Sequence, residues 1–156
     1  MKVLLSTVVL TVSLMSMVQA NVSINASSYQ KTIKLNENAE EVIAWVQAQK
    51  VVPGTIIRYV NTLENSGQQL ATKLVIDNPV PTHMEYIENS ALCQSACTLS
   101  YSVDGGKSYN NPEALFVGVG EERHLAKASE YTNIRWTVER LGAVSQSLVE
   151  YKAQLK

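Results

Sequence analysis

Apolar and polar residues alternate along three stretches in the second half of the chain. In the stretch 98–103 the apolar residues are Leu99, Tyr101 and Val103. The same alternation runs through 134–139 and through 149–155. A period of two places every second side chain on the same face of a β-strand. Each stretch therefore predicts a strand with one face in a core and the other in water.

Composition and turn residues indicate further strands. The stretches 55–63 and 71–77 are rich in Ile, Val, Thr and Tyr, which favour strands. The turns that bound them are Pro53-Gly54, Asn65-Ser66-Gly67 and Asn78-Pro79. Proline and glycine in the first two of these turns supply the fixed or positive φ that hairpin ends need. Shorter strands are predicted at 84–87 and 32–35. Because the connections are short, we expect antiparallel pairing and a sandwich-like all-β fold.

The stretch 38–50 fits two different elements. Asn38 and Glu41 resemble a helix capping box, and the apolar residues within 42–46 would cluster on one side of that helix. The same stretch fits a strand in which every second residue of 42–48 shares a face. The local pattern alone slightly favours the helix.

The first 20 residues have the pattern of a secretory signal peptide. Lys2 carries a positive charge, residues 3–18 are mainly apolar, and Ala20 ends a triplet typical of cleavage sites. The apolar run is shorter than the roughly 20 clean residues of a membrane-spanning helix. We therefore expect cleavage after Ala20. The new N-terminus would be Asn21, which, unlike cysteine, cannot carry a lipid anchor.

The remaining chain, residues 21–156, has the length of a single domain. The whole chain has 13 basic and 14 acidic residues, and loss of Lys2 leaves 12 basic residues. With a charge so near neutral, binding to nucleic acid or to a membrane surface through bulk positive charge is disfavoured. No second apolar stretch could span a membrane. We expect a periplasmic or secreted protein.

The chain contains two cysteines, Cys93 and Cys97. In an exported protein, two nearby thiols without another partner most simply form one disulfide. The loop between them is short, so the bond would act as a local staple. A metal site would need further ligands, and the two histidines, His83 and His124, lie far apart without ligand spacing. We expect no metal and no cofactor.

A series of short motifs follows in order between Val52 and Trp136. They are Val52-Pro53-Gly54-Thr55, Glu64-Asn65-Ser66-Gly67, Val75-Ile76-Asp77-Asn78-Pro79-Val80-Pro81, Met84-Glu85-Tyr86, Ser102-Val103-Asp104-Gly105-Gly106 and Tyr131-Thr132-Asn133-Ile134-Arg135-Trp136. Their order resembles a conserved repeat domain of unknown function found in bacterial secreted and cell-envelope proteins. That domain is an immunoglobulin-like antiparallel β-sandwich without known catalytic residues. The resemblance implies the same single domain for residues 21–156.

The resemblance also bears on the ambiguous stretch. In that family the residues before the Pro-Gly turn are extended, which favours a strand at 41–48. Two features depart from the family pattern. A single glycine, Gly142, stands where a Pro-Gly turn usually precedes the last strand, and the cysteine pair lies outside the pattern.

One predicted hairpin carries residues that stabilise a turn. At the offsets of an Asp box stand Ser102, Asp104, Gly106, Ser108 and Tyr109. In such a motif the carboxylate and hydroxyls accept hydrogen bonds from turn N–H groups, glycine permits the bend, and the aromatic ring packs behind it. The motif resembles those of sialidase-like propellers, where it marks a structural turn away from the active site. A single copy cannot build a propeller, so we interpret these residues as a structural turn.

Other candidates for chemistry are weaker. Carboxylates that could meet at one end of the sandwich and bind calcium are those of Asp77, Asp104, Glu121 and Glu122. The dense Asp/Asn loop typical of calcium sites is missing. A solvated turn is sufficient to explain His124 beside its acidic neighbours. Since the chain has no Gly-x-Ser-x-Gly motif, phosphate-binding loop or zinc motif, we expect no enzymatic activity.

Tyrosine is unusually frequent, with seven tyrosines against one phenylalanine. Tyrosine suits an interface because it combines a large apolar ring with a polar tip. Tyr101 and Tyr151 fall on the inward phases of predicted strands. Tyr109 and Tyr131 lie near predicted loops and are the candidate interface residues.

The sequence therefore predicts an exported, non-catalytic structural or protein-interaction module of the bacterial cell envelope. Its expected partner is an envelope protein or another copy of the chain, and addition of a strand to a sheet edge is the simplest mode of recognition. The alternative is a carbohydrate- or calcium-dependent binding module that uses the loop end of the sandwich.

Overall fold

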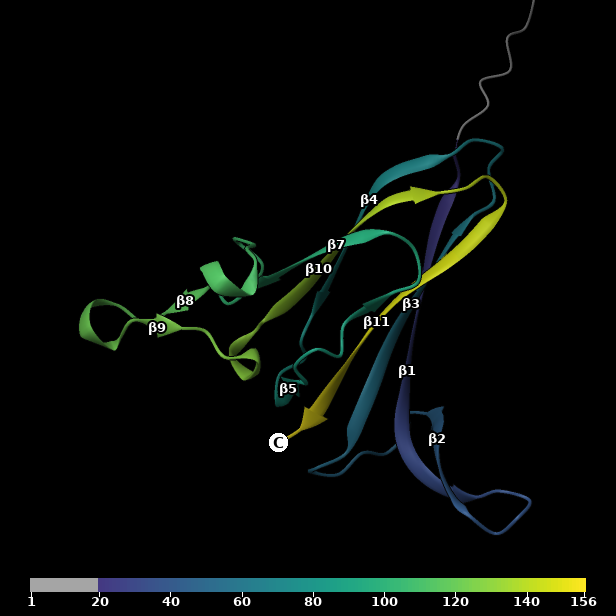
Figure 1. Ribbon diagram of the computed structural model, residues 1–156, viewed down its shortest axis with the longest axis horizontal. Coiled ribbons are helices and arrows are strands. Elements are labelled where there is room, and N and C mark those ends of the chain that lie inside the picture. Colours follow the sequence, from purple (N-terminus) through teal and green to yellow (C-terminus); the bar gives the residue numbers. More distant parts are fainter. Residues whose placement is uncertain (1–19) are drawn as a thin grey trace, which may run out of the picture.

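The computed structural model describes residues 20–156, so the predicted signal peptide lies, except for Ala20, outside the described residues. Within this range most regular structure is β-strand, and two antiparallel sheets pack against each other (Figure 1). The predicted class, an all-β antiparallel sandwich, is confirmed. Among residues 20–156, no helix has the length and apolar character needed to cross a membrane.

The larger sheet has six strands in the order β2-β1-β3-β11-β5, with β6 also paired to β11. Their bounds are β1 Val22–Leu35, β2 Glu41–Gln47, β3 Ile56–Asn65, β5 Met84–Tyr86, β6 Leu92–Cys93 and β11 Ser145–Leu155. The smaller sheet has three strands in the order β4-β10-β7. Their bounds are β4 Ala71–Pro79, β7 Cys97–Ser102 and β10 Asn133–Leu141. Because β1 and β2 extend only the larger sheet, that sheet is wider on this side.

The core lies between the two sheets. Ile134, Trp136 and Val138 of β10 are fully buried, as is Val149 of β11, and Tyr151 is nearly so. These are the inward positions that the alternation predicts, and Tyr101 is buried as well. The strand pattern in the second half of the chain is therefore confirmed.

Tyr131 is a core residue, and its assignment as an interface candidate is wrong. Its side chain is 8% exposed. Its ring centroid lies 4.7 Å from that of Tyr101 and 5.8 Å from that of Tyr86. The short helix η3 (Ala128–Glu130) turns the chain just before this residue, so Tyr131 enters the core as β10 begins.

The ambiguous stretch forms strand β2, as the resemblance favours, and not a helix. It pairs with β1 in a register that sets Ile43 opposite Ile33. The ladder to β1 satisfies backbone groups that a helix would otherwise satisfy, and this long-range pairing outweighs the local helix signals. The hairpin turn is held by Asn36, whose Oδ1 accepts the N–H groups of Asn38 and Glu40 at 2.9 Å each.

The turn after β3 is held by a buried side chain. Gly54 has a positive φ as expected, whereas Gly67 is not among the glycines with positive φ, so the expectation is wrong there. Instead, the fully buried Asn65 donates from Nδ2 to the carbonyl oxygens of Gln69 at 2.7 Å and Gly142 at 2.8 Å. Its Oδ1 accepts the Gly67 N–H at 3.1 Å.

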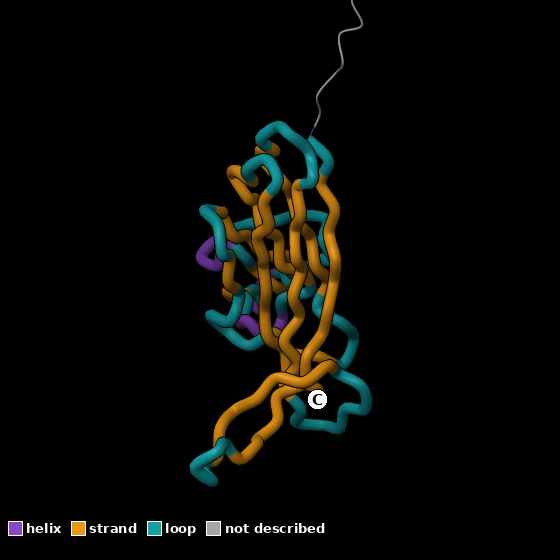
Figure 2. The backbone as a smooth tube through the Cα atoms, turned by 90° about the vertical axis from the view of Figure 1, so that its right-hand side faces the viewer, coloured by secondary structure: helices purple, strands orange, loops and turns teal. Residues whose placement is uncertain are grey.

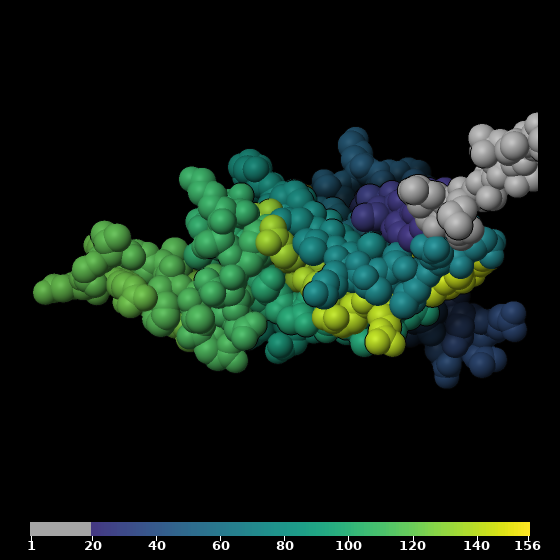
Figure 3. All heavy atoms as spheres, turned by 90° about the horizontal axis from the view of Figure 1, so that it is seen from above, coloured from purple at the N-terminus to yellow at the C-terminus, as the bar shows by residue number. Residues whose placement is uncertain are grey.

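A two-stranded ribbon of β8 (Phe116–Val117) and β9 (His124–Leu125) projects from one end of the molecule. It forms the green extension at the left of Figures 1 and 3. The adjoining short helices are η1 Pro112–Ala114 and η2 Gly120–Glu122. Gly118 has a φ of 80°, and a Cβ there would lie 2.5 Å from the Glu122 carbonyl oxygen. The ribbon was not predicted, because its strands are too short to show a period.

Candidate functional site

The five residues of the Asp-box-like motif lie together at the end of β7 and in the turn that follows it. Ser102 Oγ accepts the N–H groups of Asp104 at 3.2 Å and Gly106 at 2.9 Å. Asp104 Oδ1 accepts the Ser108 N–H at 3.0 Å, and Oδ2 accepts the Ser108 hydroxyl at 2.6 Å. A Cβ at Gly106, whose φ is 84°, would lie 2.9 Å from the Tyr109 hydroxyl oxygen. The polar side chains of Ser102, Asp104 and Ser108 are thus bonded to the turn itself.

Tyr109 links this turn to the smaller sheet. The Arg135 guanidinium carbon lies 3.5 Å from the centroid of its ring, and its hydroxyl donates to Asp77. Arg135 donates to the same carboxylate at 2.8 Å, and Asn133 Nδ2 does so at 3.2 Å. Because these contacts join β4, β10 and the turn, half-buried Tyr109 acts here as a packing residue.

The electrostatics of this cluster keep its groups in fixed protonation states. The Ser108 hydroxyl and N–H, together with Ser102, hold the pKa of Asp104 well below its usual range. Burial, aided by the bond to Asp77, raises the pKa of Tyr109 to about 12. Burial alone would raise the pKa of Asp77, but hydrogen bonds from Tyr109, Arg135 and Asn133 lower it overall. These shifts move each group away from titration near neutral pH.

The four acidic calcium candidates are not gathered in one place. Asp104 is bonded within the turn that follows β7, and Asp77 lies on β4, where it accepts the Tyr109 hydroxyl. Glu121 and Glu122 lie in η2 on the ribbon. Among residues 20–156 there is no group of three or more His, Cys, Asp or Glu side chains that could hold a metal ion.

His124 also lies on the ribbon. Its Nε2 is 3.1 Å from Glu130 Oε1, and its Nδ1 is 3.0 Å from the Glu122 carbonyl oxygen. These two contacts, the one to Glu122 first, raise the pKa of the imidazole.

The predicted disulfide between Cys93 and Cys97 is confirmed. Cys93 ends β6 in the larger sheet, and Cys97 begins β7 in the smaller sheet. The bond therefore fixes the point where the chain crosses from one sheet to the other.

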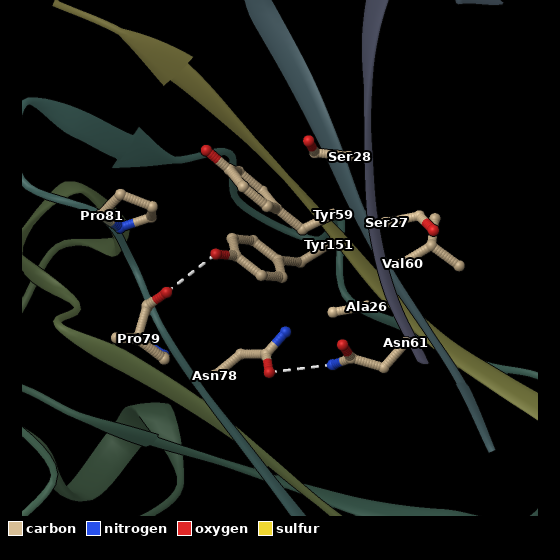
Figure 4. Close-up of a pocket in the computed structure, with 10 residues that line it drawn as sticks. All are labelled: Ala26, Ser27, Ser28, Tyr59, Val60, Asn61, Asn78, Pro79, Pro81 and Tyr151. Atoms are coloured by element: carbon tan, nitrogen blue, oxygen red, sulfur yellow. Dashed lines mark hydrogen bonds between the residues drawn. The ribbon is translucent and has the colours of Figure 1, made fainter. Parts of the chain in front are cut away.

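A cleft of about 340 Å³ opens on the side of the sandwich, between β1 and β3 of the larger sheet and the end of β4 (Figure 4). Its lining residues are Ala26, Ser27, Ser28, Tyr59, Val60, Asn61, Asn78, Pro79, Pro81 and Tyr151. None of them is charged, so the cleft suits an uncharged group.

Aromatic rings and a pair of amides form the walls of the cleft. The rings of Tyr59 and Tyr151 stack with centroids 4.9 Å apart, and the Tyr151 hydroxyl donates to the Pro79 carbonyl at 2.9 Å. Asn61 is 4% exposed, and its Nδ2 donates to Asn78 Oδ1 at 2.8 Å (Figure 4). Within the described residues this leaves the Oδ1 acceptor of Asn61 and the Nδ2 amide group of Asn78 without a hydrogen bond. Sequence reasoning missed the cleft, since β1, β3 and β4 meet here only in the fold.

The β1–β2 hairpin projects below the sandwich, at the lower left of Figure 2. Strand β3 pairs with β1 only as far as Gln30, so beyond this point β1 and β2 pair with each other. Residues directly opposite one another share a face, which places Ile33, Leu35 and Ile43 together. Their side chains are 62%, 67% and 61% exposed. We call these three residues the hairpin face.

Trp45 stands at the base of the hairpin face. The Arg58 guanidinium carbon is 5.9 Å and the Lys152 ammonium nitrogen 5.8 Å from the centroid of its ring. Arg58 is itself paired with Glu150. These contacts attach the hairpin to the outer side of the larger sheet while the hairpin face stays in solvent. The sequence predicted both strands but not this exposure, because alternation does not show whether a second layer covers the apolar side.

Comparisons of the chain with known protein families, curated proteins and solved structures found no match. The resemblance to the conserved repeat domain therefore stays a prediction.

Proposed function

We propose that this chain is an exported, non-catalytic interaction module of the bacterial cell envelope, which binds a protein on its hairpin face. The observation that carries this proposal is the exposure of Ile33, Leu35 and Ile43, each above 60%, on a projecting hairpin. Apolar surface removed from water contributes about 25 cal/mol per Å². Contiguous apolar patches of this kind typically mark binding surfaces.

The charges around the hairpin face favour a protein over a lipid surface. Glu41 lies directly opposite Leu35, so its carboxylate is on the same face as the apolar residues. Insertion into a membrane would bury this carboxylate at high cost. A protein surface offers donors for it, and Lys31 at the base of the same face adds a charge of opposite sign.

The expected location comes from the sequence. A predicted signal peptide and the resemblance of residues 52–136 to a domain of secreted and envelope proteins both support an extracytoplasmic role. The non-catalytic character is supported by the Asp-box-like cluster, whose carboxylates and hydroxyls are committed to holding the turn and β4 to β10.

Photo-crosslinking in cells that make the protein tests the proposal. A photoreactive amino acid at position 33 or 43 should give adducts with an envelope protein. The matched control is position 34, which is exposed on the opposite side of the same hairpin and should give few adducts. The double substitution Ile33→Ser with Ile43→Ser should abolish co-purification of that partner, and Lys34→Ser should preserve it. Equal labelling from positions 33 and 34 would overturn the proposal.

A second candidate function is binding of a neutral carbohydrate in the side cleft. It is favoured by the ring of Tyr59 and by the free amide acceptor and donor of Asn61 and Asn78, since sugars stack on aromatic rings and bond to amides through hydroxyls. A glycan array on residues 21–156 tests it. Binding that survives Tyr59→Phe and is lost in Tyr59→Ala, with no crosslinking from position 33, would establish this function in place of the first.

A further inference from the structure

Strand β1 has a free edge along its first residues. Strand β3 pairs with β1 from Val22 to Gln30, whereas β2 pairs with it from Tyr29 to Leu35. Over residues 22–27, therefore, one edge of β1 faces no other strand of the described chain. This part of β1, in purple, lies at the surface in Figure 3.

The hydrogen bonds at the ends of this segment show which backbone groups point outward. In an antiparallel strand, the N–H and C=O of one residue face one edge and those of the next residue face the other. The carbonyl of Asn21 accepts the N–H of Ser66, just after β3, so odd-numbered residues face β3. The carbonyl of Ser28 accepts the N–H of Ala48, just after β2, so even-numbered residues face the other edge. The residues with outward backbone groups are Val22, Ile24 and Ala26.

This edge lacks the features that usually prevent association. Exposed edge strands commonly carry charges, proline or a bulge. Residues 22–30 contain no charged residue and no proline. Ile24 lies opposite the core residue Leu63, yet its own side chain is 50% exposed. The edge thus combines unpaired backbone groups with an apolar side chain that the smaller sheet leaves uncovered.

We propose that a second copy of this chain pairs with this edge, β1 against β1, in antiparallel orientation about a twofold axis at Ile24. A twofold contact brings the same patch together from both copies, and a neutral strand does not repel itself. In this register Ile24 faces Ile24 of the second copy, and Val22 faces Ala26. All three outward residues then form hydrogen-bonded pairs, which gives about six backbone hydrogen bonds.

The register also fits the ends of the strand. Asn21 would lie opposite Ser27 of the second copy. In that copy β2 pairs with β1 from Tyr29 onward, two residues beyond Ser27. A chain that starts at Asn21, as cleavage after Ala20 would produce, stops just short of that β2. The surface is separate from the hairpin face, so this proposal and the proposed function can fail independently.

Sedimentation velocity of residues 21–156 over a series of concentrations tests the pairing. The wild-type chain should form a dimer. Ile24→Lys should weaken the dimer by at least about tenfold, because two ammonium groups meet across the axis, and Ile24→Glu should do the same with two carboxylates. An equimolar mixture of the two variants should recover the dimer. The matched control is Ser23→Lys, on the opposite face of the strand, which should dimerise like the wild type.

A second variant separates pairing from folding. Ala26→Pro removes an N–H that faces outward and none that faces β3, so the variant should keep the wild-type circular dichroism spectrum and lose the dimer. A wild-type chain that stays monomeric at every concentration would overturn the proposal. So would a dimer that persists in both Ile24 variants. A dimer lost only on Ile33→Ser would move self-association to the hairpin face, which overturns the edge pairing and leaves the proposed function standing.

Discussion

The side chain of Asn65 gives a demanding test of how the sandwich is held together. It is fully buried, donates to the carbonyls of Gln69 and Gly142 at 2.7 and 2.8 Å, and accepts the Gly67 N–H at 3.1 Å. These bonds join the turn after β3 to the turn between β10 and β11. Asn65→Ala removes these three bonds together with two longer ones, at 3.3 Å, to the Leu141 carbonyl and from the Asn21 N–H. The Gly142 carbonyl keeps its bond from the Ser145 hydroxyl at 2.7 Å.

The magnitude follows from these contacts. One net hydrogen bond contributes about 1 kcal/mol, and a partner left unsatisfied in the interior costs about 1–3 kcal/mol. Gln69 and Gly142 are themselves exposed, so water can reach their carbonyls after the substitution and the lower figure applies. Three bonds then give a loss of about 3 kcal/mol in the free energy of unfolding. For a domain of this length the midpoint temperature should fall by about 12 °C.

Urea denaturation followed by circular dichroism measures this loss. Asn61→Ala is the matched control, because it removes a single amide hydrogen bond and should cost only about 1 kcal/mol. Asn65→Asp keeps the size and the acceptor but replaces the donor, so it should be at least as destabilising as alanine at neutral pH and recover in part when the carboxyl is protonated. If Asn65→Ala lowers the free energy of unfolding no more than Asn61→Ala does, the hydrogen bonds of Asn65 do not stabilise the two turns as described.

Three further predictions concern the core, the turn and the disulfide. Trp136→Phe should cost clearly less than truncation to alanine, which should cost about 3–5 kcal/mol. The indole Nε1 has no acceptor within the described chain, so the change to phenylalanine loses no hydrogen bond. Equal losses for the two variants in urea denaturation would contradict this. The pKa of Asp104 is lower in the folded chain than its ordinary value of 3.8, so the ionised carboxylate stabilises the fold above pH 3.8, and this stability is lost as the pH falls through the folded-state pKa. Asp104→Asn should therefore flatten the dependence of the free energy of unfolding on pH below 3.8. An unchanged slope would be evidence against this role of Asp104. Replacing Cys93 and Cys97 together by serine should lower the free energy of unfolding by about 2 kcal/mol, the loop-closure value for so short a loop, and unchanged stability would refute that estimate.

Alternation in the sequence was sufficient to predict the core strands. Trp136 and Tyr151 are buried where the period of two places them, because that period is a direct consequence of the strand pleat. The first half of β1 was not predicted, although Val22, Ile24 and Ala26 alternate there with polar residues. Residues 22–30 are mostly small and polar, and they form a strand because β3 supplies a long-range partner.

The candidate site divides in the same way. Ser102 to Tyr109 are neighbours in sequence, so their offsets were enough to predict that they meet in one turn. The hairpin face depends on where β3 begins, and the side cleft depends on which side the smaller sheet leaves open. No local pattern contains that information. The apolar residues Ile33, Leu35 and Ile43 were visible in the sequence, but their exposure was not.

Amide hydrogen exchange of residues 21–156, measured by mass spectrometry, shows whether this chain binds its partners through its uncovered β surfaces. Exchange is followed at low and high protein concentration and with envelope extract added. The segment 22–27 should gain protection as concentration rises, and 31–45 should gain protection when extract is added. Unchanged exchange in both segments under all three conditions would contradict binding through these surfaces.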